Sequence, residues 1–333
     1  MRNRGSAGLQ QNCIQEKIDE KVYVDCALEN GKALLEWQID RQEAAHICMK
    51  DTGGDVVLEC WKAWDEEEPL QSVLLKPNLW SGIANPYLYQ LEISFWDRHG
   101  NFVDSFNCYF PLRSIEPGQF SPGSISNTLS GNEKYVRLNG EMVPLKTVRY
   151  HVPQEQVMRE RRRLILEDMR RFLDLGVNSV FVEEKDRSYS FLQLCNRIGL
   201  LVVSEEYLGQ TDWSIPTFRS AEKALFTASN RPTEYYYLYK ARWCSTPFVH
   251  IWPESLKRQN DGNYTVTCYS NCKKVALYSE GKLFEFQQGQ GIFTFQDVPT
   301  KGPCVVLSAE GDGCSTALTV HKTFTKISPN GDN

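Results

Sequence analysis

Apolar and polar residues alternate along the first third of the chain. Within residues 22–27, the apolar Val22, Val24 and Cys26 occupy every second position. A period of two is typical of a β-strand with one buried face. Turn sequences such as Glu29-Asn30-Gly31 separate the stretches. The alternation recurs at residues 33–39, 56–64, 89–96 and 102–110, and this spacing predicts a β-sandwich of about 100 residues.

The middle of the chain changes to helical periodicity. Residues 142–150 have a short strand pattern, and residues 155–175 have helical spacing that Gly176 ends. A strand at 178–182, a helix at 189–197 followed by Gly199, and a strand at 200–204 come next. Alternating strands and helices with short connections predict parallel β/α units. The first helix is predicted to bury Val157, Leu164, Ile165, Met169, Phe172 and Leu173.

The last part of the chain returns to alternation. Residues 206–231 have weak periodicity, and residues 233–243 form one more helix pattern. Residues 248–325 alternate again between glycine-rich turns, which predicts a second β-sandwich.

Composition and charge narrow the class of protein. The chain has 333 residues, of which 41% are hydrophobic and 24% charged, as in ordinary globular proteins. Its net charge is −5, whereas a nucleic-acid-binding protein usually carries an excess of basic residues. No run reaches the roughly 18 apolar residues of a membrane span, and residues 1–11 lack the apolar core of a signal peptide. We therefore expect a cytoplasmic protein without a nucleic-acid or membrane partner.

The eleven cysteines form no C-x-x-C pair. The nearest spacing, Cys268 to Cys272, lacks the second pair and the histidines that a zinc site requires. We expect reduced, mostly buried thiols and no metal. The sequence also lacks a glycine-rich phosphate loop, and no other cofactor is expected.

Several segments, taken in order, resemble glycoside hydrolase family 2, the group of β-galactosidases, β-glucuronidases and β-mannosidases. Leu79-Trp80-Ser81 and Asn85-Pro86-Tyr87-Leu88-Tyr89 are similar to the "LWSPENPYLY" stretch of its immunoglobulin-like domain. Residues 110–116 are similar to the "FGFRxIE" exit of that domain, with Pro111 replacing the glycine. The segment from Leu138 to His151 resembles the entry to the catalytic barrel. Residues 191–205, 235–243 and 247–282 resemble later parts of the barrel and the module that follows it.

The resemblance implies a multi-domain α+β protein with a shortened barrel. Its parts are an immunoglobulin-like β-sandwich, a truncated TIM-barrel-like β/α region and a second immunoglobulin-like β-sandwich. A complete barrel takes about 250 residues, whereas the segment between Glu205 and the last helix, residues 206–232, leaves no room for several β/α units. The predicted parts are a tail at 1–18, a sandwich at 19–116, the β/α domain at 117–245, a sandwich at 246–326 and a tail at 327–333.

The shortening removes the positions of the catalytic carboxyl groups. Retaining glycosidases use two carboxyl groups about 5–5.5 Å apart. In the family, the acid/base follows an asparagine on the fourth barrel strand and the nucleophile ends the seventh. The only Asn-Glu dipeptide here, Asn132-Glu133, precedes the first barrel strand. At the ends of the second and third strands, Phe181 and Glu184 replace the family's arginine and histidine, and Ser204 replaces an aspartate.

A rebuilt site remains an alternative. The carboxyl groups of Glu183, Glu184, Glu205 and Glu206 could pair at the ends of adjacent strands, with one pKa raised so that it serves as an acid. The competing interpretation is that they are solvated or cap a helix. The candidate carbohydrate-binding residues are His151, Asp186 and Glu205, of which His151 matches a family position near the sugar.

Two further runs have a structural and a functional interpretation. The aromatic run at residues 235–239, with Trp243, could stack on sugars, but its helical spacing favours a packing face. The arginines between 159 and 171 alternate with Glu160, Glu167 and Asp168, which favours a solvated helix face with ion pairs over nucleic-acid binding.

Three parallel strands cannot close into a barrel, so the edges of the predicted sheet need covering. Residues 206–231, the flanking sandwiches, a second copy in a homodimer or a partner chain could cover them. The preferred hypothesis is a catalytically inactive protein that retains carbohydrate binding or serves as a scaffold. The alternatives are an active glycosidase of the β-galactosidase kind with a rebuilt carboxylate pair, and a chain whose site a partner completes.

Overall fold

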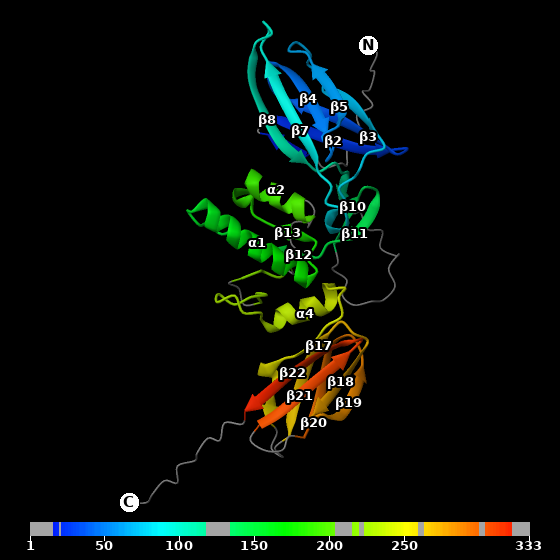
Figure 1. Ribbon diagram of the computed structural model, residues 1–333, viewed down its shortest axis with the longest axis vertical. Helices are drawn as coiled ribbons and strands as arrows, with labels where there is room; N and C mark the ends of the chain where they lie inside the picture. The colour runs from blue at the N-terminus through cyan, green and yellow to red at the C-terminus, as the bar shows by residue number, and fades with distance from the viewer. Residues whose placement is uncertain are drawn as a thin grey trace, which may run out of the picture. The chain divides into compact units, whose positions relative to one another are not determined.

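The computed structural model describes residues 16–19, 21–117, 134–203, 215–219, 223–258, 263–299 and 304–321 (Figure 1). The chain divides into two compact units, which are described separately below. The first comprises Met1–Thr147 and Asn178–Ile215, and the second comprises Val148–Val177 and Pro216–Asn333.

The first unit begins with two antiparallel sheets packed face to face, as the alternation predicts. One sheet has the order β1 (Glu16–Asp19), β2 (Val22–Glu29), β3 (Lys32–Ile39) and β6 (Leu70–Leu75). The other has the order β5 (Val56–Lys62), β4 (Ala44–Lys50), β7 (Tyr89–Trp96) and β8 (Phe102–Phe110). Their inward residues form one core around Trp37, Ile47 and Phe95. Burying such large apolar side chains is the main favourable term that holds the two sheets together.

Strands β1, β4 and β6 are absent from the set that alternation predicted, and β1 overlaps the tail predicted at residues 1–18. In β4, Ile47, Cys48 and Met49 are buried in succession, so the period of two is lost in the sequence. In β6, Val73 and Leu75 are exposed and Leu74 between them is buried, so three consecutive apolar residues hide the alternation of burial.

The predicted strand at 142–150 is wrong as a single element, because two strands of different sheets occupy it. β11 (Glu141–Pro144) forms a hairpin with β10 (Tyr135–Leu138), which also pairs with β9 (Ile115–Pro117). β12 (Thr147–Arg149) instead begins the sheet of order β12-β13-β14. The hairpin turn places Asn139 and Gly140 at positive φ, which these two residue types tolerate best.

The alternation of strands and helices in the middle of the chain is confirmed. α1 (Met158–Leu175) precedes β13 (Ser179–Phe181), and α2 (Tyr189–Ile198) precedes β14 (Leu201–Val203), which pairs with β13 in parallel. Gly176 and Gly199 end the two helices in the left-handed conformation, as predicted. Two 3₁₀ turns, η1 (Gly82–Ala84) and η2 (Glu184–Asp186), lie in the first unit.

The buried face of α1 differs from the predicted one at both ends. Val157 is 61% exposed and Leu173 is 40% exposed, while Ile165, Met169 and Phe172 are buried as expected. Asp168, predicted on a solvated face, is only 1% exposed. The prediction failed because two of the groups that bind this carboxylate, Tyr150 and Arg219, lie outside α1 in the sequence.

In the second unit, described residues between 216 and 233 continue the strand pairing beyond β12. Thr217 forms a parallel bridge with Arg149, Arg219 forms one with Phe226, and Phe226 forms an antiparallel one with Pro232. Side chains from this segment pack in a chain of ring contacts through Tyr150, Phe172, Phe218, Phe226 and Tyr236. Part of the segment with weak periodicity therefore pairs with Arg149, the last residue of β12.

The second unit ends in another pair of sheets, which follow α4 (Glu234–Trp243). In the first sheet β17 (Tyr264–Ser270) pairs with β15 (Val249–Ile251), β16 (Lys257–Arg258) and β20 (Gly291–Val298); η3 (Pro253–Ser255) connects β15 and β16. The second sheet has the order β19 (Lys282–Gln288), β18 (Lys274–Ser279), β21 (Cys304–Gly311) and β22 (Cys314–His321). Val266, Leu277 and Phe295 are among the residues of the core between them.

Among the described residues, no helix is long and apolar enough to cross a membrane. The described cysteines all carry free thiols; Cys195 is fully buried, while Cys244 is half-buried at the end of α4. Across the described residues, no cluster of three or more histidine, cysteine or acidic side chains has metal-binding geometry.

Candidate functional site

The structure brings three of the predicted acidic residues together in the turn that follows β13. Glu183 precedes η2, and Glu184 and Asp186 lie within it. The carboxylate of Glu183 forms an ion pair with Lys185, with an Nζ–Oε2 distance of 2.6 Å. Glu184 is exposed, whereas Asp186 is 4% exposed. Glu205 and Glu206, the other two candidates, lie outside the described residues.

Arg187, which sequence reasoning did not single out, ties the ends of two strands together. Its Nε donates a hydrogen bond to the carbonyl oxygen of Val182 at 3.2 Å, and its Nη2 donates to that of Val203 at 3.4 Å. These carbonyls follow or end the parallel strands β13 and β14, the edge where barrel enzymes place their chemistry. A structural cation therefore lies at this edge. The predicted ligand His151 belongs to the second unit, where it is exposed after the buried Tyr150.

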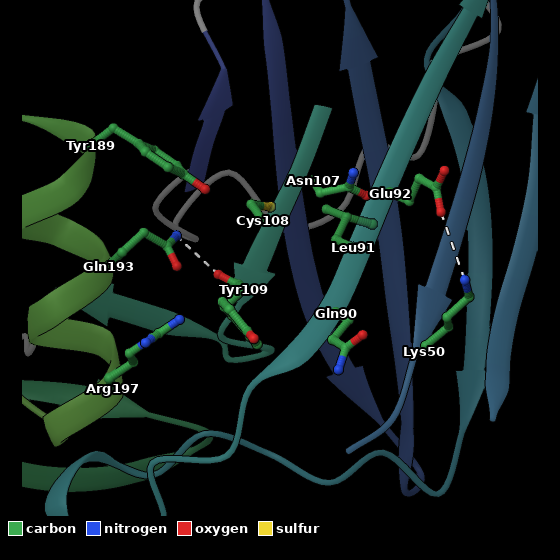
Figure 2. Close-up of a pocket in the computed structure, with 10 residues that line it drawn as sticks. All are labelled: Lys50, Gln90, Leu91, Glu92, Asn107, Cys108, Tyr109, Tyr189, Gln193 and Arg197. Atoms are coloured by element: carbon green, nitrogen blue, oxygen red, sulfur yellow. Dashed lines mark hydrogen bonds and ion pairs between the residues drawn. The ribbon is translucent and has the colours of Figure 1, made fainter. Parts of the chain in front are cut away.

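A pocket of about 360 Å³ lies elsewhere in the first unit, between the sheet β5-β4-β7-β8 and α2 (Figure 2). Alternation along the strands turns Lys50, Gln90 and Glu92 out of the sandwich core. The facing helix contributes Tyr189, Gln193 and Arg197, which are four residues apart and therefore share one side of α2. The remaining lining residues are Leu91, Asn107, Cys108 and Tyr109.

Polar contacts fix the walls of the pocket. Lys50 and Glu92 form an ion pair at 3.7 Å, and the Nε2 of Gln193 donates to the carbonyl oxygen of Tyr109 at 3.0 Å (Figure 2). The guanidinium of Arg197 lies 4.4 Å from the centre of the Tyr109 ring. The Oε1 of Gln193 is buried and accepts no hydrogen bond from the described residues. An orphaned buried acceptor is costly, so this atom is suited to a donor supplied by a ligand.

The chemistry of the pocket favours binding over hydrolysis. Its only carboxylate, Glu92, is paired with Lys50, while glycoside hydrolysis requires two carboxyl groups. Burial raises the pKa of Cys108 to about 12, against the opposing hydrogen bond from Tyr189, so the thiol stays protonated at neutral pH. A protonated thiol is a poor nucleophile.

None of these pocket residues was a predicted site residue. The available signal was the spacing of Tyr189, Gln193 and Arg197 on a helix whose opposite side carries the buried Phe191 and Cys195. The sequence did not reveal that this polar side of α2 faces the outward residues of a sandwich sheet.

Comparison with known proteins identifies a family and several proteins to which the chain is similar. Residues 17–113 match the family described as glycosyl hydrolases family 2. The chain is 27% identical over 168 residues to the beta-galactosidase large subunit of Lactobacillus acidophilus, covering 49% of this chain and 24% of that protein. It is 22% identical over 213 residues to a beta-galactosidase of Halalkalibacterium halodurans, covering 59% and 20%. The matched region thus spans about a quarter or less of these relatives' length.

Solved structures with a similar fold cover a larger share of the chain. An FMN-binding beta-glucuronidase from Facaelibacterium prausnitzii L2-6 matches with a TM-score of 0.68 and 14% identity, over 91% of this chain and 73% of that one. A Bacteroides uniformis beta-glucuronidase matches with a TM-score of 0.58 and 12% identity, over 93% and 60%. The chain is therefore similar in sequence to glycosyl hydrolases family 2 over residues 17–113, and similar in fold, over most of its length, to these solved beta-glucuronidases.

Proposed function

We propose that this chain binds carbohydrate and does not hydrolyse glycosidic bonds. The observation that carries the proposal is the shortness of the β/α region. Between β14 and α4, the described residues 215–219 and 223–233 form isolated bridges in place of strands and helices. The fourth and seventh barrel strands, which supply both carboxyl groups in the family, have no counterpart in these described segments.

The described acidic residues at the end of β13 support the same conclusion. Glu183 is bound by Lys185, and Arg187 occupies the carbonyl ends of β13 and β14. A general acid needs a carboxyl group whose pKa is raised by burial or by a neighbouring negative charge. In this turn the carboxylate of Glu183 is instead held in an ion pair with Lys185.

The finer architecture is part of the proposal. We interpret the sheet β12-β13-β14 as the remnant of a TIM-barrel-like region and both sandwiches as immunoglobulin-like. We also infer that a second copy or a partner chain covers the β14 edge of the remnant, which pairs with no further strand among the described residues. Free thiols in the described part of the chain fit a cytoplasmic protein. A monomeric particle in light scattering would exclude the second copy.

A panel of nitrophenyl glycosides, including galactosides, glucuronides and mannosides, tests the absence of hydrolysis. We expect no release of nitrophenol above the uncatalysed rate. Turnover that Glu205→Gln or Glu183→Gln abolishes would establish the alternative, a glycosidase with a rebuilt carboxylate pair. Binding to a glycan array without turnover is the expected result, and absence of both would leave the scaffold role.

A further inference from the structure

One face of the sheet β5-β4-β7-β8 points away from the sandwich core. Ala45, Ile47 and Met49 of β4 belong to the core, so the alternate residues His46 and Lys50 point outward. Residues directly opposite one another on paired strands point to the same side of the sheet. Trp61, opposite His46, and Gln90, opposite Lys50, therefore point outward as well. We call this surface the outer face and define it by His46, Lys50, Glu59, Trp61, Gln90, Glu92, Ser94, Trp96, Phe102, Asn107 and Tyr109.

One end of the outer face is a row of aromatic rings. The rings of His46 and Trp61 are stacked with centroids 4.2 Å apart, and Trp61 continues to Trp96 and then to Phe102. A hydrogen bond of 2.9 Å between His46 and Glu59 fixes the imidazole ring. Trp61 and Phe102 are each 56% exposed. Large exposed aromatic side chains held rigidly in a row are typical of a binding surface.

The other end of the outer face is the pocket beside α2, which is rich in planar polar groups. The amides of Gln90, Asn107 and Gln193 and the guanidinium of Arg197 surround it, and Tyr109 and Tyr189 are 41% and 50% exposed. Planar amides and guanidinium groups present donors and acceptors in fixed pairs, which match the neighbouring hydroxyl groups of a sugar. The tyrosine rings offer apolar surface for the C–H side of the same sugar.

Two buried polar atoms on this surface lack a partner within the described part of the chain. They are the Oε1 of Gln193 in the pocket and the indole Nε1 of Trp96 in the aromatic row. Buried side-chain polar atoms normally have hydrogen-bond partners, and indole groups usually find an acceptor. One acceptor and one donor are therefore available, which suits a ligand whose hydroxyl groups act in both ways.

The two ends are spaced for an extended ligand. His46 and Lys50 lie four residues apart on one strand, a separation of about 14 Å at the usual rise of a β-strand. A single sugar ring cannot span that distance, but a short oligosaccharide can. The outer face carries two cations, Lys50 and Arg197 from the bordering helix, and two carboxylates, Glu59 and Glu92. This balance provides no net attraction for a polyanion.

We propose that the outer face of the first sandwich binds a neutral oligosaccharide. One sugar unit occupies the pocket against Gln193 and Tyr109, and a later unit stacks on the exposed ring of Trp61. The proposal rests on the carbohydrate binding proposed above and gives that function a place and a ligand class. A protein partner would use the aromatic row, but it would not need the paired amides of the pocket.

Titration calorimetry with neutral tetrasaccharides of galacto, gluco and manno configuration tests the proposal. At least one is expected to bind, and its affinity should exceed that of the matching monosaccharide and of a polyuronic acid of equal length. Trp61→Ala and Gln193→Ala should each weaken binding about tenfold or more, through loss of stacking and of a hydrogen bond. Trp64→Ala is the matched control, because Trp64 is 53% exposed just beyond the end of β5 and should leave affinity unchanged.

The outcomes separate this inference from the proposed function. A tetrasaccharide that binds wild type, Trp61→Ala and Gln193→Ala equally well would place the sugar site elsewhere and overturn only the inference. Equal affinity for the polyuronic acid would overturn the neutral ligand class. Absence of binding to every saccharide would overturn both proposals. If a protein then bound the outer face, and Trp61→Ala but not Gln193→Ala abolished that binding, the outer face would be a protein interface. Circular dichroism of Trp61→Ala and Gln193→Ala checks that both variants keep the wild-type fold.

Discussion

Arg219 holds the carboxylate of Asp168 through both of its terminal nitrogens. Its Nη1 donates to Oδ2 at 2.9 Å, and its Nη2 donates to Oδ1. Arg171 also donates to this carboxylate, at 3.0 Å, and the hydroxyl of Tyr150 donates to it at 3.1 Å. The charge of Asp168 is therefore fully compensated although only 1% of the residue is exposed. This network fastens the segment around Arg219 to α1, where the sequence predicted a solvated helix face.

Removing the carboxylate should destabilise the second unit strongly. Asp168→Asn leaves two arginine side chains without their shared anion, and breaking a buried ion pair typically costs about 3–5 kcal/mol. Urea unfolding followed by tryptophan fluorescence measures the change. Glu167→Gln, at the neighbouring and more exposed position, should shift the midpoint little. A loss below about 1 kcal/mol for Asp168→Asn would show that the network does not anchor the segment.

A close backbone approach should make Gly199 intolerant of any side chain. A Cβ atom at Gly199 would lie 2.5 Å from the carbonyl carbon of Gly82 and from the Cα of Ile83. Gly199 also has φ of 83°, which alone costs other residues about 1–2 kcal/mol. Gly140 is the matched control, because its φ is 86° and a Cβ there meets nothing within 4 Å.

We therefore expect Gly199→Ala to cost several kcal/mol more than Gly140→Ala in the free energy of unfolding. Thermal unfolding of the two variants beside wild type measures the difference. Equal losses would mean that only the left-handed backbone matters and that the contact with Gly82 relaxes readily.

The two helix ends show what local sequence is sufficient to predict. Gly176 and Gly199 follow apolar helical repeats, and both adopt the left-handed C-terminal conformation that this pattern indicates. The strand β4 could not be predicted in the same way, because Ile47, Cys48 and Met49 are all buried and mask the alternation. Local periodicity reports one-sided burial and fails where a residue on the other side of the strand, here Cys48, is buried as well.

Features that depend on distant partners were not predictable. Asp168 was interpreted as a surface residue because Arg219, its main partner, lies 51 positions away. The pocket likewise combines residues of β4, β7 and β8 with one side of α2. Most of these residues are ordinary polar residues in their own segments, and only the packing of the helix beside the sheet makes them a site.

His250 should contribute an acid-dependent loss of stability. Its ring stacks on Tyr237 with centroids 3.7 Å apart. Burial lowers the pKa of His250; Glu254 opposes this shift and Lys240 reinforces it. The unfolded chain therefore binds a proton more readily than the folded one. Stability from this residue is complete above the unfolded pKa of about 6.5 and is lost as pH falls below it.

His250→Phe keeps a ring against Tyr237 but cannot be protonated. Its unfolding free energy should fall less than that of wild type between pH 7 and pH 5, as measured by urea unfolding at each pH. His99→Asn, at an exposed turn of the first sandwich, should retain the wild-type dependence. A profile for His250→Phe that parallels wild type would exclude His250 as a source of the acid sensitivity.

Cys272 and Cys314 are positioned to form a disulfide bond under oxidation. Their sulfur atoms lie 3.6 Å apart, and Cys272 is 1% exposed. Burial raises the pKa of Cys272 to about 11, with Ser270 opposing the shift and Cys314 reinforcing it. Because the thiolate is the reactive form, oxidation by diamide should be slow at pH 7 and much faster at pH 9.5.

The bond would close a loop of 42 residues and should raise the free energy of unfolding by at most about 4 kcal/mol, because the cross-link restricts the unfolded chain. Peptide mapping under non-reducing conditions identifies the pair, and urea unfolding of the oxidised protein measures the gain. Cys314→Ser should remove both the cross-link and the stabilisation, whereas Cys304→Ser, at the start of the same hairpin, should preserve them. Cross-links that form instead through Cys304 or Cys244 would mean that exposure, rather than the short sulfur separation, decides which thiols react.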